Sequence, residues 1–188
     1  MSLPKTPKHW TRQSFLISTD KSLLSLSAIN AAFASEPLYW AYPLPESVLQ
    51  DMIDKSFCFG LYKTPSPSPS LLPSSPSSTN NVPENESEWS QVQQIGFARL
   101  ITDTCTIAYL SDVYILPKYQ GLGLGGWLLD CVDDLVRPLP HLRWFLLRTG
   151  EERSLDAYRA RFGMEVLDNG DLSRGALFMG RRGGGNRV

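Results

Sequence analysis

Hydrophobic and polar residues alternate along this chain with a period that changes from segment to segment, and each change marks a predicted element. Residues 15–18 form a short apolar run typical of a strand. Asp20 then precedes apolar residues spaced three or four positions apart up to Phe33, which predicts a helix capped by this aspartate. A second helix is predicted over 45–56, where a proline opens an amphipathic pattern, and a strand over 57–62.

The same kind of pattern continues around a glycine-rich stretch in the second half of the chain. Strands are predicted over 94–102, 106–116, 144–147, 164–167 and 176–180, and helices over 154–162 and from the glycines to about Arg137. The resulting order is β-α-α-β-β-β-α-β-α-β-β. This mixed order predicts an α+β fold with a mixed, largely antiparallel sheet and about four helices.

Residues 64–91 differ in composition from the rest, because serine, proline and asparagine dominate them. Such a segment cannot bury enough apolar surface to offset the entropy lost on ordering. We interpret it as a disordered insertion in a hairpin connection, because neither flanking part alone supplies a complete set of elements. The sequence therefore predicts a single domain over 10–180, interrupted by this insertion and followed by a flexible tail over 181–188.

Composition and charge limit the possible functions without defining one. The 188 residues carry a net charge of −1, which gives no reason to expect a nucleic acid or an anionic membrane as partner. No apolar run approaches the roughly 18 residues of a membrane span, and the N-terminus lacks the apolar core of a secretory signal. Three isolated cysteines and two scattered histidines predict reduced thiols and no metal site. We therefore expect a cytoplasmic or nuclear protein, monomeric or homodimeric.

The stretch 117–126, PKYQGLGLGG, carries the strongest chemical signal in the chain. It follows a predicted strand and opens a predicted helix. Glycine removes side chains where a backbone wraps closely around a ligand, and a helix start offers free N–H groups and a partial positive charge. Together these features predict a phosphate-binding loop.

Three kinds of phosphate-binding loop compete for this stretch. A Walker A loop requires lysine and then serine or threonine after its last glycine, where this chain has a Trp-Leu pair, so it is excluded. A dinucleotide loop matches at Gly121, Gly123 and Gly126. However, that loop belongs to an early βαβ unit and needs a later carboxylate, which residues 140–148 lack. The third kind binds an acyl-coenzyme A.

The complete string 115–125, ILPKYQGLGLG, resembles the signature of the GNAT N-acetyltransferase family. FGM at 162–164 is similar to the family's aromatic-Gly-Phe ending, and four further segments are similar to a GNAT subgroup: YWA at 39–41, CFGLY at 58–62, IGFAR at 95–99 and LSDV at 110–113. The resemblance covers residues 13–180 and includes the order of elements. It implies a sheet splayed between the fourth and fifth predicted strands, with acetyl-CoA as co-substrate and no metal.

The resemblance also implies which residues hold the cofactor. Backbone groups of Val113 and Ile115, at the end of the splayed strand, would pair with the pantetheine amides as an added strand does. The family often carries arginine and lysine in the glycine loop, whereas here Lys118 is the cation expected nearby. Backbone amides would hold the pyrophosphate, and these belong to Gln120, Gly121, Gly123, Leu124, Gly125 and Gly126.

Acetyl transfer to an amine requires a base for the amine, an N–H donor for the oxyanion and an acid for the leaving thiolate. The resemblance places the donor at a bulge close to Asp112 and Val113. Asp112 interrupts an apolar strand, and it is either the general base or a carboxylate that orders the bulge. Tyr158 is the candidate acid or, alternatively, a core tyrosine. It lies five residues before Gly163, where the family tyrosine lies four before its glycine.

The acceptor site is expected at the segment 36–42, which joins the first two helices and overhangs this site in the family. Tyr39 and Trp40 would form an aromatic wall there, or would instead plug the two helices together. Cys131 lies in an apolar stripe, so no covalent acyl-enzyme is expected. The sequence therefore predicts an acetyl-CoA-dependent N-acetyltransferase that acts directly on an amine of a small molecule or peptide. The alternatives are a non-catalytic acetyl-CoA-binding module and, less favoured, a dinucleotide-binding protein.

Overall fold

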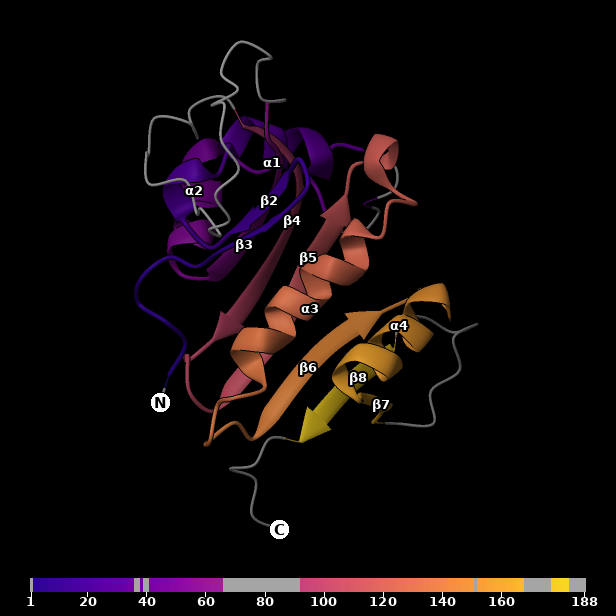
Figure 1. The fold of residues 1–188 in the computed structure, drawn as a ribbon. Helices are drawn as coiled ribbons and strands as arrows, with labels where there is room; N and C mark the ends of the chain where they lie inside the picture. The colour runs from indigo at the N-terminus through magenta and orange to yellow at the C-terminus, as the bar shows by residue number, and fades with distance from the viewer. Residues whose placement is uncertain are drawn as a thin grey trace, which may run out of the picture.

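A single sheet runs through the computed structural model, which describes residues 2–35, 38, 41–65, 92–150, 152–167 and 177–182. The strands lie side by side in the order β1-β2-β3-β4-β5-β6-β8-β7 (Figure 1). Their bounds are β1 (His9–Arg12), β2 (Phe15–Ser18), β3 (Phe57–Lys63), β4 (Gln93–Thr102), β5 (Ile107–Ile115), β6 (Trp144–Thr149), β7 (Glu165–Val166) and β8 (Leu177–Arg182).

Among the described strands, neighbours run antiparallel except in the middle of the sheet, where β5 and β6 run parallel. The helix α3 (Leu124–Val136) forms the crossover between these two strands, as a parallel connection requires. The observed fold is therefore the α+β architecture with a largely antiparallel sheet that the sequence predicts.

The parallel pair separates partway along its length. β5 and β6 stay in register from Ile107 opposite Trp144 to Leu110 opposite Leu147. β5 then continues along β4, where Ile115 lies opposite Gly96. Within the described residues, β6 has no further register partner on β5 and follows β8 instead. The sheet is thus splayed between β5 and β6, which are the fourth and fifth strands of the predicted order.

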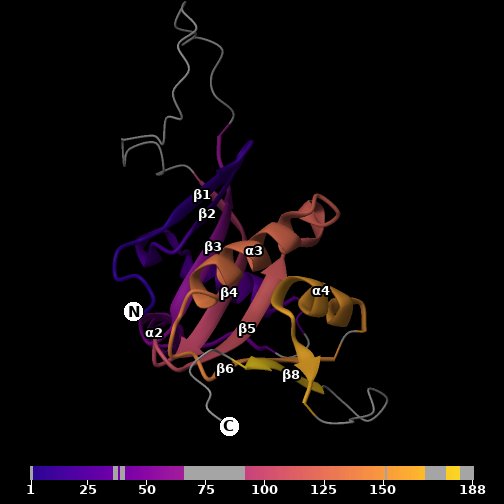
Figure 2. The ribbon, with the colours of Figure 1, turned by 60° about the horizontal axis from the view of Figure 1, so that its bottom comes forward.

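Helices cover both faces of this sheet. α1 (Leu26–Phe33) and α2 (Glu46–Asp54) lie behind β2, β3 and β4 in Figure 1, while α3 and α4 (Glu152–Phe162) lie in front. Figure 2, turned toward the end of the sheet, shows α3 and α4 side by side on one face. The glycine-rich stretch that opens α3 therefore lies with the α3 and α4 face, and the first two helices belong to the other.

Each helical layer has its own apolar cluster. Leu128 and Val132 of α3 are fully buried against the sheet, and the rings of Phe145 and Phe162 meet edge to face with centroids 4.9 Å apart. On the other face, α1 and α2 pack against Phe97 and the half of the sheet that includes β3. Each fully buried side chain of this size contributes roughly 1.5–3 kcal/mol relative to exposure, so both layers are fixed to the sheet.

The sequence does not predict β1, and the burial of its residues explains why. Three of its four side chains are exposed, which leaves no apolar alternation to detect. Trp10 alone reaches inward, and its ring stacks on Phe59 with centroids 6.3 Å apart. β1 is an edge strand that pairs with β2, so its backbone hydrogen bonds, rather than its side chains, define it.

The capping prediction at Asp20 is wrong for α1. Asp20 caps a short 3-10 helix, η1 (Lys21–Leu23), by accepting the N–H of Ser22 on Oδ1 at 2.9 Å. The chain is extended again at Leu24, and Ser25 then caps α1 by accepting the N–H of Ala28 at 3.2 Å. Asp20 and Ser25 are both good N-cap residues. The sequence pattern alone therefore predicts one helix, whereas the extended Leu24 separates a 3-10 helix from α1.

Part of the predicted organisation lies outside the described residues. This applies to residues 66–91 of the predicted insertion and to residues 183–188 of the predicted tail. Directly after β3, Thr64 donates its N–H to the carbonyl of Ser14 at 2.9 Å, which extends the sheet hydrogen bonding to the start of that connection. No helix in the described ranges is long and apolar enough to cross a membrane.

Candidate active site

A β-bulge interrupts β5 close to the point where β6 leaves it. The register between β4 and β5 shifts next to Arg99, so that Asp112 and Val113 of β5 face one residue of β4. Asp112 has a φ of 53°, a left-handed conformation that aspartate tolerates better than most residues. Because a bulge takes its extra residue out of the hydrogen-bond ladder, backbone groups become available here. The structure therefore has a bulge at the position that the sequence predicts.

Two neighbours hold the carboxylate of Asp112. Arg99 donates from Nε to Oδ2, and Ser111 donates from Oγ to Oδ1 at 3.2 Å. Arg99 also donates from Nη1 to the hydroxyl of Ser56 at 3.1 Å, which connects the bulge to the turn between α2 and β3. The side chains of Asp112 and Arg99 are 9% and 14% exposed. Removing either partner would therefore leave a poorly solvated charge.

The sequence predicts neither that the side chain of Arg99 points toward Asp112 nor that Ser56 lies beside the two residues. Arg99 lies on the strand next to Asp112, but the bulge shifts the alternation of side chains, so strand periodicity alone cannot show that the two residues meet. Ser56 is brought to them by the turn between α2 and β3. The arrangement fits a carboxylate that orders the bulge, which is one of the two roles expected for Asp112.

Two tyrosines of β5 flank this ion pair. Burial is the main cause that raises the pKa of Tyr109, although the charge of Arg148 acts in the opposite direction. Burial, followed by the negative charge of Asp112, raises the pKa of Tyr114 well above its usual range. Both phenols therefore stay protonated at neutral pH, where they are hydrogen-bond donors rather than bases.

The glycine loop begins with the 3-10 helix η4 (Pro117–Tyr119), one residue after the end of β5. Gln120 donates its backbone N–H to the carbonyl of Pro117 at 3.2 Å, and its side-chain amide to the carbonyl of Ile115 at 2.9 Å. The backbone N–H of Gln120 is therefore engaged within the loop, whereas the resemblance implies that it holds a pyrophosphate. Its side chain instead fixes the end of β5.

Two glycines give the loop its shape. Gly121 and Gly123 have φ values of 78° and 73°, a conformation that glycine adopts without steric cost. A Cβ at either position would meet no atom within 4 Å, so the backbone lies open there. Gly123 is also the N-cap of α3, and the first helical bond runs from the N–H of Trp127 to its carbonyl at 3.1 Å.

The first turn of α3 supplies the remaining predicted amides. Leu124, Gly125 and Gly126 precede the first helical hydrogen bond, so their N–H groups are the helix's orphan donors. They add to the partial positive charge of the macrodipole, which suits a phosphate. A Cβ on Gly125 would make only ordinary contact with Ile115, at 3.9 Å. Glycine is therefore not required at 125 by packing within the protein.

Glycine at 126 has a different explanation. A Cβ there would come 2.7 Å from Cζ of Arg161, a residue of α4 whose guanidinium lies against this turn. The same guanidinium forms an ion pair with Asp130, one turn further along α3. Gly126 thus makes room for the side chain of a neighbouring helix, a reason that no local sequence pattern contains.

Tyr158 lies on α4, half-buried against the cluster beneath α3. Its ring stacks on Phe162 with centroids 6.0 Å apart and 13° between the ring planes. The helix is regular up to its end, because Gly163 donates its N–H to the carbonyl of Arg159 at 3.0 Å. No extra residue is therefore accommodated between Arg159 and Gly163, and the tyrosine keeps the shifted spacing that the sequence shows.

The acceptor side is described only in part. Tyr39 and Trp40, the predicted aromatic wall, lie outside the described residues. Glu46 lies exposed in the first turn of α2, and Tyr42 is 79% exposed.

The two buried cysteines, Cys58 and Cys131, are poor nucleophiles in this fold. Burial raises the pKa of the Cys131 thiol to about 12, and that of Cys58 to about 12 as well. A thiol reacts as its thiolate, so neither side chain would carry an acyl group at neutral pH. Cys131 lies in the buried stripe of α3, as the sequence predicts.

Comparisons with known proteins identify the family. Residues 76–164 match the model of the acetyltransferase (GNAT) family. A Gibberella zeae protein whose name describes it as an acetyltransferase is 41% identical over 150 residues, which cover 79% of each chain. A solved GNAT-family protein from Xanthomonas campestris pv. campestris is 31% identical, with 80% of this chain and 84% of that chain covered and a TM-score of 0.56.

A more distant structure shares the fold. A GNAT-family acetyltransferase from Elizabethkingia anophelis, solved with acetyl-CoA bound, is 11% identical, with a TM-score of 0.52 over 91% of this chain and 99% of that chain. The fold, the bulge and the glycine loop are those of an acyltransferase whose sheet opens between two parallel strands. The chain belongs to the GNAT family and is an N-acetyltransferase.

Proposed function

We propose that this protein transfers an acetyl group from acetyl-CoA directly to an amine of a small molecule or a peptide. The proposal is carried by the coincidence of three features on β5. These are the bulge at Asp112, the end of pairing with β6 after Leu110, and the open glycine loop that follows Ile115. Such an arrangement accepts an extended ligand between two strands and its phosphates at a helix start.

Binding of the cofactor would use backbone groups almost throughout. Val113 and Ile115 pair with the pantetheine amides along the free stretch of β5. The N–H groups around the loop and the first turn of α3 hold the pyrophosphate, and they belong to Gly121, Gly123, Leu124, Gly125 and Gly126. Gln120 acts indirectly, because its side chain fixes the carbonyl of Ile115. Bound acetyl-CoA supplies an acetyl group activated as a thioester.

The chemical step follows from the position of the bulge. The neutral amine attacks the thioester carbon, a C–N bond forms and the C–S bond breaks. An N–H of the bulge, at Asp112 or Val113, stabilises the oxyanion. Tyr158 gives its proton to the leaving thiolate, and the proton lost by the amine passes to solvent or to a carboxylate.

Asp112 has two possible roles in this scheme. In the first, its ion pair with Arg99 and its hydrogen bond from Ser111 hold the backbone of the bulge in the left-handed conformation. In the second, the same carboxylate takes the proton of the amine, directly or through water. We favour the first role, because guanidinium and hydroxyl donors already engage both carboxylate oxygens.

For the acceptor, we place the amine near the segment 36–42, with Tyr39 and Trp40 as an aromatic wall. Glu36 and Glu46 would attract a cationic amine to this wall, because unlike charges steer the approach of a ligand. An acceptor screen that compares small amines with peptides distinguishes the two kinds of acceptor.

Calorimetric titration with acetyl-CoA, desulfo-CoA and NADH tests the proposal. We expect both CoA compounds to bind and NADH to give no heat. An amine panel, followed by release of free CoA thiol, then tests turnover. Binding of NADH without CoA would overturn the proposal in favour of a dinucleotide site. Saturation by acetyl-CoA without CoA release across small amines and peptides would leave a binding module instead.

A further inference from the structure

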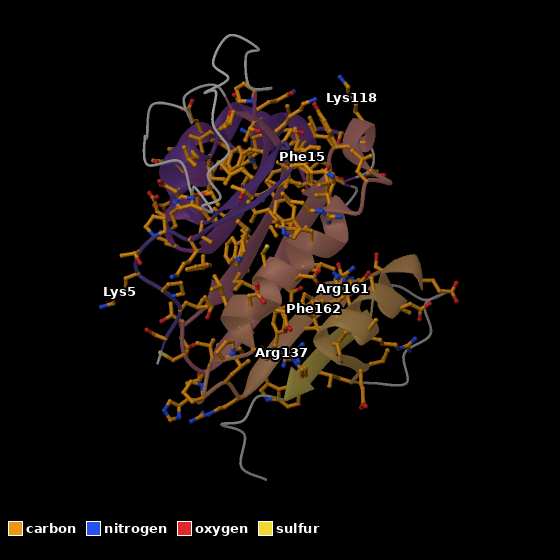
Figure 3. All side chains as sticks on the ribbon, viewed as in Figure 1. Lys5, Phe15, Lys118, Arg137, Arg161 and Phe162 are labelled. Atoms are coloured by element: carbon orange, nitrogen blue, oxygen red, sulfur yellow. The ribbon has the colours of Figure 1, made fainter. Side chains whose placement is uncertain are left out.

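Arg161 belongs to α4, but its guanidinium lies against the first turn of α3. Gly126 has no side chain, and the guanidinium occupies the space where a Cβ would be, with Cζ 2.7 Å from that position. Nη1 forms an ion pair with Asp130, which fixes the guanidinium alongside α3. Figure 3 shows Arg161 between α3 and α4.

The charge at the glycine loop depends on this residue. Gln120 and Leu122 carry no charge, and the ammonium of Lys118 lies over the ring of Tyr119, 5.9 Å from its centroid. Figure 3 shows Lys118 pointing outward from η4, away from α3. Arg161, in contrast, is in contact with the turn whose N–H groups are the orphan donors. Folding therefore brings a cation to this turn from a residue 35 positions away from Gly126 in the sequence, too far for a loop motif to include it.

Arg161 is both anchored and accessible. Its side chain is 36% exposed, and that of Asp130 is 54% exposed. A guanidinium has five N–H donors in a fixed plane, so the bond from Nη1 to Asp130 leaves others for a second anion. Guanidinium pairs with phosphate through short, charge-assisted hydrogen bonds. The carboxylate of Asp130 therefore orients the guanidinium without using all of its donors.

We infer that Arg161 is a phosphate-binding residue of the cofactor site and that Asp130 and Gly126 position it. The ligand group is a phosphate of the acyl carrier, either the pyrophosphate or the 3′-phosphate of its ribose. The inference rests on the proposed function, because it requires a CoA thioester at the start of α3. Gly126 then contributes to the site in two ways: its own N–H faces the phosphate, and its missing side chain leaves space for the guanidinium of Arg161.

The experiment is calorimetric titration of the wild type and of Arg161→Gln with CoA, 3′-dephospho-CoA and pantetheine. We expect Arg161→Gln to weaken CoA binding by about 10- to 100-fold and to leave pantetheine binding unchanged. If only CoA is weakened, Arg161 binds the 3′-phosphate. If CoA and 3′-dephospho-CoA are weakened equally, it binds the pyrophosphate.

Three further variants separate phosphate binding from structural effects. Arg159→Gln removes a neighbouring arginine that pairs with Asp156 at 3.5 Å on the exposed side of α4, and should bind CoA like the wild type. Arg161→Lys should keep part of the affinity, because the charge remains. Gly126→Ala should weaken CoA more than pantetheine, because its methyl group displaces the guanidinium. Thermal melts show whether each variant is folded.

Two outcomes would overturn the inference while leaving the proposed function intact. One is an Arg161→Gln protein that binds all three ligands like the wild type. The other is an equal loss for pantetheine and CoA, which would make Arg161 a purely structural contact between α3 and α4. A wild-type protein that binds no CoA compound would instead remove the proposed function itself, and the inference with it.

Discussion

Asp112 combines a strained backbone with a paired side chain. Its φ of 53° is unfavourable for most residues, and its carboxylate is engaged by Arg99 and Ser111. Strained residues persist only where their surroundings hold them, and the two hydrogen bonds supply that restraint. The side chain and the bulge are therefore one unit, and a change in the carboxylate should be felt in the backbone.

Replacing Asp112 by asparagine tests this coupling. We expect kcat to fall at every pH and stability to drop by about 1–3 kcal/mol, because Arg99 loses its counter-charge in a largely buried position. The measurements are pH–rate profiles and urea unfolding of both proteins. A loss of rate confined to the range below about pH 8, with unchanged stability, would instead make Asp112 the general base.

Tyr158→Phe tests the proposed acid, because the change removes only the phenolic hydroxyl. The ring stack on Phe162 survives the change, so stability should stay within about 1 kcal/mol. If the hydroxyl protonates the thiolate, kcat should fall by about 10²-fold while acetyl-CoA binding is retained. Unchanged turnover with a good acceptor would assign Tyr158 to the core.

Alkylation of the cysteines tests direct transfer. Burial raises the pKa of both Cys58 and Cys131 to about 12, so iodoacetamide at about pH 8 should spare them, whereas the partly exposed Cys105 should react. Mass spectrometry would locate the label, and CoA release would report activity. We expect labelled protein and Cys131→Ala to remain active. Complete loss of turnover in a folded Cys131→Ala protein would point to an acyl-enzyme.

At the scale of single elements, the start of α3 depends on backbone shape more than on side chains. Gly121 and Gly123 turn the chain through left-handed conformations, after which the helix begins at Leu124. An L-residue in that conformation costs roughly 1 kcal/mol or more. The loop is therefore preorganised by two residues that make no side-chain contact at all.

Gly123→Ala should weaken cofactor binding through this strain. We expect a loss of about 1–2 kcal/mol in stability and weaker binding of acetyl-CoA by calorimetry, because the orphan N–H groups shift. Gly125→Ala is the matched control for stability, since this position is helical and a Cβ there meets Ile115 at 3.9 Å. It should be neutral or slightly stabilising. Equal destabilisation by the two variants would contradict the role of positive φ.

At the scale of the whole molecule, one buried carboxylate connects three elements. Asp133 of α3 accepts from Arg181 of β8 at 3.1 Å and from Nε of Arg137 at 2.5 Å. Arg137 in turn donates to the carbonyl of Arg161 at the end of α4, at 3.0 Å. Desolvation is the main cause that lowers the pKa of Arg181, and the charge of Asp133 opposes it. This network holds α4 and β8 against α3.

Asp133→Asn should therefore weaken the packing of α4 and β8 against α3. We expect stability to fall by about 1–3 kcal/mol, because Arg181 stays poorly solvated without its counter-charge. Asp134→Asn, at the next position on the exposed side of α3, should change stability by no more than about 0.5 kcal/mol. Thermal unfolding of both variants makes the comparison. Equal melting temperatures would show that the network contributes nothing to stability.

Most elements were predictable because their signals are local. Apolar periodicity predicts seven of the eight strands in the described residues and the approximate places of α1, α2, α3 and α4. The strands predicted over 94–102 and 106–116 leave a short turn between them, where the carboxylate of Asp103 accepts the N–H groups of Cys105 and Thr106 at 3.0 and 2.7 Å. The sequence does not predict β1, because three of its four side chains are exposed and its pairing with the adjacent β2 leaves no apolar alternation to detect.

The sequence by itself determined the fold class, the family and the position of the glycine loop, because each of these is encoded in residues that are neighbours along the chain. Only the tertiary structure decided that Arg99 meets Asp112, that Ser56 joins them, and that Arg161 lies against Gly126. These pairs are separated by 13, 43 and 35 positions. A bulge, a turn and a helix crossing bring them together, and the register of each depends on packing across the whole sheet.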